Sequence, residues 1–268
     1  MLPDPPLTLH DIPLDSLSTL DTSSDTYRKW TTSVVDAVTS LLASLPLNKP
    51  SSDIWSPQKL FHAKSYPTQT WNQARGSKAS DKMKLNVRGV GETDGLRWHC
   101  RQTKVTREQG TYEDFERGLL RDHTPNEKAY IEACIEADEV KILKKGELEV
   151  WRTRYNNSPA SPRQFTFLLL TLSLPVPPPP AAQLRSFTVV SIPVLEGTDE
   201  KHDGKYVKGK YVSVEHVQET EEGGVVWTMA VASDPGGSVP HMLSEYVMCS
   251  KIAEDVPSFL EWVKKPRA

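Results

Sequence analysis

The chain has 268 residues, of which 37% are hydrophobic and 25% charged, a composition typical of a globular protein with a sizeable core. Its 32 basic and 35 acidic residues give a net charge of −3, which disfavours nucleic acid and a polybasic membrane anchor. Three widely spaced cysteines, Cys100, Cys134 and Cys249, disfavour a disulfide framework. No signal peptide pattern opens the chain and no apolar run has the length of a spanning helix. We therefore expect a cytoplasmic protein without an integral membrane segment.

The N-terminal region predicts an irregular start followed by one helix. Ser24 or Asp25 can cap this helix, and Pro46 and Pro50 end it. The apolar residues that recur at helical spacing are Tyr27, Trp30, Val34, Val38, Leu41, Leu42 and Leu45. We expect residues 1–50 to pack as a segment and helix on a domain formed by residues 51–268, the whole being one structural unit.

The middle of the chain predicts two strands and then two short helices. Residues 84–88 and 96–105 alternate as strands do, with a glycine-rich turn between them. Thr111 and Asp114 have the spacing of a capping box, and Tyr112 follows as the first apolar residue of that helix. Thr124 and Pro125 predict the start of a second helix.

The remaining chain predicts strands and a long terminal helix. Strand patterns occupy residues 140–143, 148–155, 165–174, 187–194, 211–217 and 225–232. Apolar residues at helical spacing run from Pro240 to about Val263, and Pro257 predicts a kink. This order predicts an α+β fold in which an amphipathic helix covers an antiparallel sheet.

Several motifs resemble one known family. The most specific is Ser-Asp-Pro-Gly-Gly-Ser-Val-Pro at residues 233–240, and residues 98–102, 115–119, 209–217 and 252–260 accompany it in the expected order. They resemble a fungal family of unknown function in the START-like superfamily of lipid-transfer domains, over roughly residues 60–265. The resemblance implies the helix-grip fold: a curved antiparallel sheet wrapped around a long C-terminal helix, with a cavity between them.

Catalytic and cofactor motifs are missing from the sequence. It contains no GxSxG, HExxH, CxxC or Walker pattern, so we expect no metal and no cofactor, and no catalytic constellation identifies itself. Single residues still supply acid–base candidates, namely His99, His123, His216, Tyr112 and Tyr130.

Pocket candidates come from the predicted interface between sheet and terminal helix. They are Trp98, Cys100, Tyr112, Trp227, Met229, Tyr246 and Val247, with Arg101 and His123 as polar candidates. Ordinary core packing is the alternative for the apolar residues, and solvent-facing ion pairs are the alternative for the polar ones.

The strand at residues 96–105 leaves two arrangements open. Trp98 and Cys100 share one face, and Arg101 lies on the other. We favour the tryptophan face as the inward one, since an exposed tryptophan is costly and an exposed arginine is not. If Arg101 faced inward, it would need a carboxylate, such as Glu215, or a ligand head group.

These patterns favour a binding module for a hydrophobic small molecule: a lipid, a sterol, or a polyketide or terpene metabolite. Transient contact with a membrane stays open. The fold resemblance also allows a cyclase or a related enzyme, and a ligand-free interaction domain is the third alternative.

Overall fold

The computed structural model describes residues 2–4, 6–45, 55–57, 61–63, 66–73, 97–158, 160–173, 184–197, 205–238 and 241–265. The strand predicted at residues 84–88 and its glycine turn lie outside these ranges. Within them, no helix combines the length and hydropathy needed to cross a bilayer.

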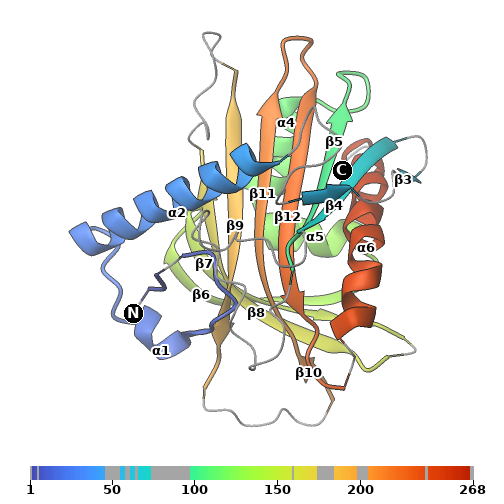
Figure 1. Cartoon of the computed structure of the whole chain (residues 1–268). Coiled ribbons are helices and arrows are strands. Elements are labelled where there is room, and N and C mark those ends of the chain that lie inside the picture. The colour runs from blue at the N-terminus through green and yellow to red at the C-terminus, as the bar shows by residue number, and fades with distance from the viewer. Residues whose placement is uncertain are drawn as a thin grey trace.

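The described strands form one 12-stranded sheet (Figure 1). Its main path is antiparallel throughout and runs through β2 (Trp55–Pro57), β4 (Tyr66–Gln73), β5 (His99–Val105), β12 (Val225–Asp234), β11 (Lys210–Glu219), β9 (Ser186–Leu195), β8 (Arg163–Leu172), β7 (Leu148–Tyr155) and β6 (Cys134–Lys144). β3 (Phe61–Ala63) pairs with β4, while the short β1 (Ile12–Pro13) and β10 (Val207–Lys208) pair in parallel with β9 and β8.

One face of the sheet is covered by the N-terminal segment. Helix α2 (Asp25–Ser44), which follows the short α1 (Leu14–Leu17), begins at the predicted cap: the Ser24 side chain accepts a hydrogen bond from the Tyr27 amide. Its buried apolar stripe shares a core cluster with outward residues of the sheet, including Val212 and Ala230. α2 therefore occupies the outer face and lies across the strands in Figure 1.

The opposite, inner face is covered by the terminal helix α6 (His241–Val263), in which Pro257 lies. Phe259 and Leu260 of α6 share a second core cluster with Trp227, Val217 and Phe187 of the sheet. The predicted α+β fold, a curved antiparallel sheet with the long C-terminal helix against it, is confirmed.

Two short helical turns complete the inner layer. Thr111 and Asp114 form the predicted capping box of α4 (Tyr112–Phe115), which continues into the π-helical turn η1 (Glu116–Leu120). Helix α5 (His123–Tyr130) begins two residues earlier than predicted. Its N-cap is Asp122, with φ of 47°, rather than Thr124, because Asp122 turns the chain through the left-handed region.

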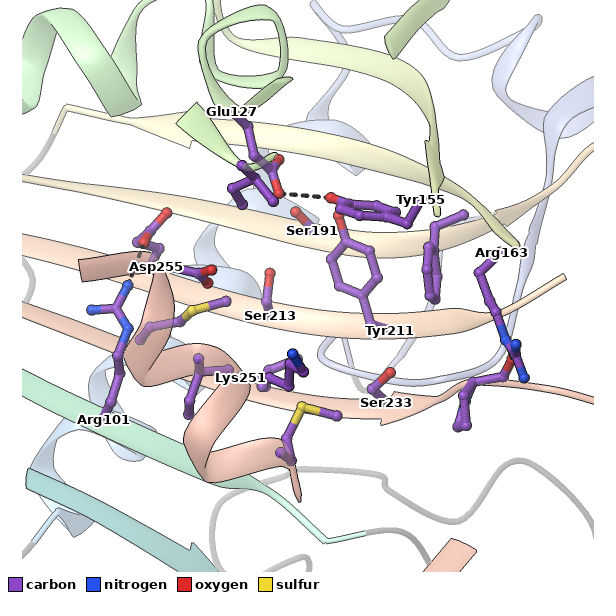
Figure 2. Close-up of a pocket in the computed structure, with 18 of the residues that line it drawn as sticks. Arg101, Glu127, Tyr155, Arg163, Ser191, Tyr211, Ser213, Ser233, Lys251 and Asp255 are labelled. Carbon is purple, nitrogen blue, oxygen red and sulfur yellow. Dashed lines mark hydrogen bonds and ion pairs between the residues drawn. The ribbon is translucent and has the colours of Figure 1, made fainter. Parts of the chain in front are cut away.

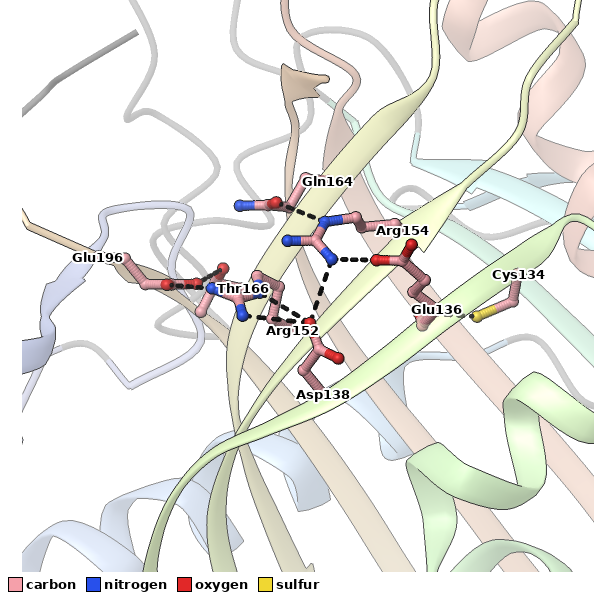
Figure 3. A network of polar contacts seen from close by, with 8 residues as sticks. All are labelled: Cys134, Glu136, Asp138, Arg152, Arg154, Gln164, Thr166 and Glu196. Carbon is pink, nitrogen blue, oxygen red and sulfur yellow. Dashed lines mark hydrogen bonds and ion pairs between the residues drawn. The ribbon is translucent and has the colours of Figure 1, made fainter. Parts of the chain in front are cut away.

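Arginines on the outer face of β7 form structural ion pairs (Figure 3). Arg152 binds Asp138 and Glu196 at 3.1 and 2.9 Å, and Arg154 binds Glu136 and Asp138. All of these side chains are partly exposed, so this network accounts for the two arginines without a ligand.

Candidate functional site

A cavity of about 650 Å³ lies between the inner face of the sheet and helices α5 and α6. This volume falls within the range of roughly 300–1,000 Å³ found for small-molecule sites. Because side chains alternate along a strand, every second residue reaches the cavity. On β11 these are Tyr211, Ser213 and Glu215, and on β12 they are Trp227, Met229, Val231 and Ser233.

Five of the predicted site residues line this cavity: Arg101, His123, Trp227, Met229 and Val247. Tyr112 does not. It is buried beside Phe187, with the ring centroids 5.8 Å apart. The side chain of Tyr246 lies outside the described part of the chain. Of the acid–base candidates, His123 and Tyr130 line the cavity, whereas His99, His216 and Tyr112 do not.

The favoured face assignment of β5 is corrected by the structure. Arg101 faces the cavity and is fully buried, whereas Trp98 and Cys100 belong to the core cluster beneath α2. The physical reason is that α2 covers the outer face, so Trp98 is buried without facing the cavity. Burial of an aromatic residue therefore does not distinguish the two faces of this sheet.

Arg101 takes part in a buried polar cluster with Glu215 and Trp227. Its Nη2 lies 3.3 Å from Glu215 Oε1, which also accepts a hydrogen bond of 2.8 Å from Trp227 Nε1. The guanidinium carbon lies 3.8 Å from the centroid of the indole ring. Burial lowers the pKa of Arg101, and the Glu215 carboxylate opposes this effect.

A second polar cluster joins α5 to β7. The Tyr155 hydroxyl donates a hydrogen bond of 2.8 Å to Glu127 Oε1, as Figure 2 shows. His123 Nδ1 lies 2.7 Å from the Leu119 carbonyl oxygen, so this nitrogen carries a proton, and Nε2 lies 4.0 Å from Glu127 Oε2. Burial raises the pKa of Glu127, opposed by His123.

Asp255 brings a third carboxyl group into the cavity from α6. Burial raises the pKa of this carboxyl to about 8; Arg101 opposes the rise, and Glu127 and Glu215 reinforce it. Of the three carboxyl groups, those of Glu215 and Asp255 act electrostatically on Arg101.

Sequence reasoning missed Glu127, Tyr155 and Asp255 as cavity residues. Glu127 and Tyr155 follow ordinary helix and strand patterns, so nothing in them marked a site. Asp255 did carry a signal, because it lies on α6 one residue before the buried Val256 and four residues before the buried Phe259. A carboxylate on the apolar side of a packed helix requires a partner. No group of His, Cys, Asp or Glu side chains in the described ranges is arranged to hold a metal ion.

Comparisons with known proteins agree with this architecture. Residues 98–263 match the family described as "Protein of unknown function (DUF3074)". The fission yeast Schizosaccharomyces pombe has a relative, "Uncharacterized protein C577.11", that is 27% identical over 176 residues, or 64% of this chain and 70% of the relative.

Solved lipid-transfer domains share the fold. Human StAR-related lipid transfer protein 5 superposes with a TM-score of 0.62 at 12% identity, over 88% of this chain and 98% of its own. The STAR-related lipid transfer protein of Xanthomonas axonopodis gives a TM-score of 0.54 at 14% identity, over 79% and 99% of the two chains. At such identities the likeness shows the fold alone.

Proposed function

This chain belongs to the DUF3074 family, and we propose that it binds one hydrophobic small molecule in the cavity between its sheet and α6. The observation that carries the proposal is the cavity itself, which is lined by apolar residues such as Phe165, Met229 and Ile252 and has a polar inner end. Sites for small molecules commonly combine apolar walls with a few polar groups that fix the ligand's orientation.

The ligand class that we propose is a lipid, a sterol, or a polyketide or terpene metabolite. Burial of its apolar surface would contribute about 25 cal/mol per Å² before ordering costs are subtracted. The structural relatives are named for lipid transfer, which supports transfer of the ligand as well as its binding. Our proposal of transfer includes a transient contact of this protein with a membrane. Cys100, Cys134 and Cys249 are buried free thiols, which supports a reducing, cytoplasmic location.

Displacement of an uncharged fluorescent dye, Nile red, tests this proposal. One dye molecule should bind per chain and be released by lipids. Met229→Trp should abolish binding because the indole fills cavity space. Val226→Trp is the matched control, since Val226 lies on the same strand outside the cavity and pairs with Lys104 and Gln218. A folded protein that binds no dye, or equal loss in both variants, would refute the proposal.

A second candidate function is catalysis on a bound metabolite, such as a cyclisation. It is favoured by the acid–base groups within the cavity, above all Glu127 hydrogen-bonded to Tyr155 and the high pKa of Asp255. Incubation with a lipid extract separates the two functions: a binder returns its ligand unchanged, and an enzyme returns a changed mass. A protein that retains nothing would support the ligand-free interaction domain.

A further inference from the structure

A buried arginine without an acidic partner lies at the start of β8. Arg163 is 5% exposed, and Figure 2 shows it at the far end of the cavity from Arg101. Its Nε donates a hydrogen bond of 3.3 Å to the Pro235 carbonyl oxygen, and its Nη1 donates to the Ser161 carbonyl oxygen. Within the described ranges no carboxylate lies within 4.0 Å of its nitrogens. Because a buried cation is costly without a counter-ion, this guanidinium is suited to bind an anion.

The chain that connects β7 to β8 reaches the surface beside this arginine. Its residues Asn157 and Ala160 are exposed and also line the cavity. Ser158 and Ser161 in the same connection are exposed, and each precedes a proline. Proline has no amide hydrogen and keeps the preceding residue extended. Exposed, extended Ser-Pro pairs are the substrates of proline-directed serine kinases.

The sequence contains two other Ser-Pro or Thr-Pro pairs, and their placement does not suit a kinase. Thr124 is fully buried in α5. Ser56 lies in strand β2, where it pairs with Asn72 of β4. The connection between β7 and β8 therefore holds the two accessible candidates.

Ser161 differs from Ser158 in its distance along the chain from Arg163. The Arg163 guanidinium folds back onto the carbonyl oxygen of Ser161, and residues two apart in an extended chain share a side. A phosphate on the Ser161 hydroxyl would thus lie beside a cation that has no acidic partner in the described ranges. Ser158 lacks such a neighbour among its listed contacts: its amide donates a 3.3 Å hydrogen bond to Asn156 Oδ1.

We propose that Ser161 is a phosphorylation site for a proline-directed serine kinase and that Arg163 binds the phosphate. The Ser161 Oγ attacks the γ-phosphorus of ATP, the bond from that phosphorus to its bridging oxygen breaks, and ADP leaves. The hydroxyl proton passes to the catalytic aspartate of the kinase. The product is a phosphate with a charge of about −2, which forms charge-assisted hydrogen bonds with a guanidinium. Because Arg163 also holds the Pro235 carbonyl, the phosphate links the connection between β7 and β8 to the turn before α6.

Incubation of the purified chain with ATP and an activated mitogen-activated protein kinase tests the site. The intact mass should increase by one phosphate. Ser161→Ala should remove most of this incorporation, and Ser158→Ala, the matched control on the same connection, should retain it. A folded chain that accepts no phosphate, or one that accepts it at Ser158 alone, would overturn the assignment.

Phosphorus NMR of the phosphorylated chain tests the role of Arg163. The second pKa of phosphoserine, ordinarily about 6, should be lower in the parent than in Arg163→Gln by at least about half a unit. Arg163→Lys keeps the charge and should keep most of this difference. Arg152→Gln is the control, because Arg152 already binds Asp138 and Glu196, and it should leave the phosphate pKa as in the parent.

Circular dichroism confirms that each variant is folded before the comparison. An equal phosphate pKa in the parent and in a folded Arg163→Gln would overturn the pairing. Neither measurement requires a bound ligand, so the result stands whether or not the cavity binds a hydrophobic molecule.

Discussion

Replacing Trp227 with alanine should destabilise the protein severely, because this residue joins the sheet to α6 and to the buried ion pair. Trp227 is 1% exposed, and its ring centroid lies 5.2 and 5.1 Å from those of Phe115 and Phe259. The prediction that it faces the terminal helix is thus confirmed. Truncation of a buried tryptophan costs about 3–5 kcal/mol. Loss of its hydrogen bond to the Glu215 carboxylate adds about 1.5–3 kcal/mol.

We therefore expect Trp227→Ala to lower the free energy of unfolding by about 5 kcal/mol. Trp227→Phe keeps an aromatic ring between Phe115 and Phe259 and loses the hydrogen bond, so its cost should be about half as large. Urea unfolding followed by far-ultraviolet circular dichroism is the suitable assay, since the substitution removes a fluorophore. A loss below about 1 kcal/mol for Trp227→Ala would refute the packing described for this residue.

Three further substitutions test other parts of the fold. Burial lowers the pKa of His216 from 6.5 to about 4, so the stability of the folded protein should fall as the pH drops from 6.5 to 4. His216→Gln should remove this part of the pH dependence of the urea midpoint. Plots of midpoint against pH that run parallel for the parent and the variant would contradict the prediction. The pKa of Asp255 is raised to about 8 from 3.8, so the folded state binds a proton more tightly than the unfolded chain. Asp255→Asn should thus have the same stability as the parent near pH 4 and be more stable than the parent by a few kcal/mol at pH 8, since a tenfold difference in proton affinity corresponds to about 1.4 kcal/mol. A stability difference between variant and parent that stays constant with pH would refute this prediction. A Cβ at Gly118 would lie 2.5 Å from Phe259 Cε2, so Gly118→Ala should cost about 1–3 kcal/mol in thermal or urea melts, and an unchanged melt would show that η1 tolerates the methyl group.

Local patterns were enough to predict most of the architecture. The apolar spacing of α2 and α6 and the capping box at Thr111 and Asp114 depend on nearby residues, and the structure confirms them. The alternation of β11 and β12 likewise placed Trp227 on the helix side. The division into a segment of residues 1–50 and a domain of residues 51–268 stays a prediction.

The site was harder to predict because its groups meet across the fold. Arg101 and Glu215 are 114 positions apart, and their pairing was considered only as the consequence of a face assignment that we disfavoured. That assignment was wrong because both faces of β5 are buried, one by α2 and one by the inner layer. Alternation separates two faces, but it does not say which of two buried faces encloses a cavity.

Native mass spectrometry of the purified chain after incubation with a lipid extract tests the central claim most directly. We expect one retained hydrophobic molecule per chain, bound by the parent protein and by Val226→Trp and lost in Met229→Trp. A folded chain that retains no molecule, or that retains the same molecule after Met229→Trp, would contradict the assignment of this cavity as the binding site.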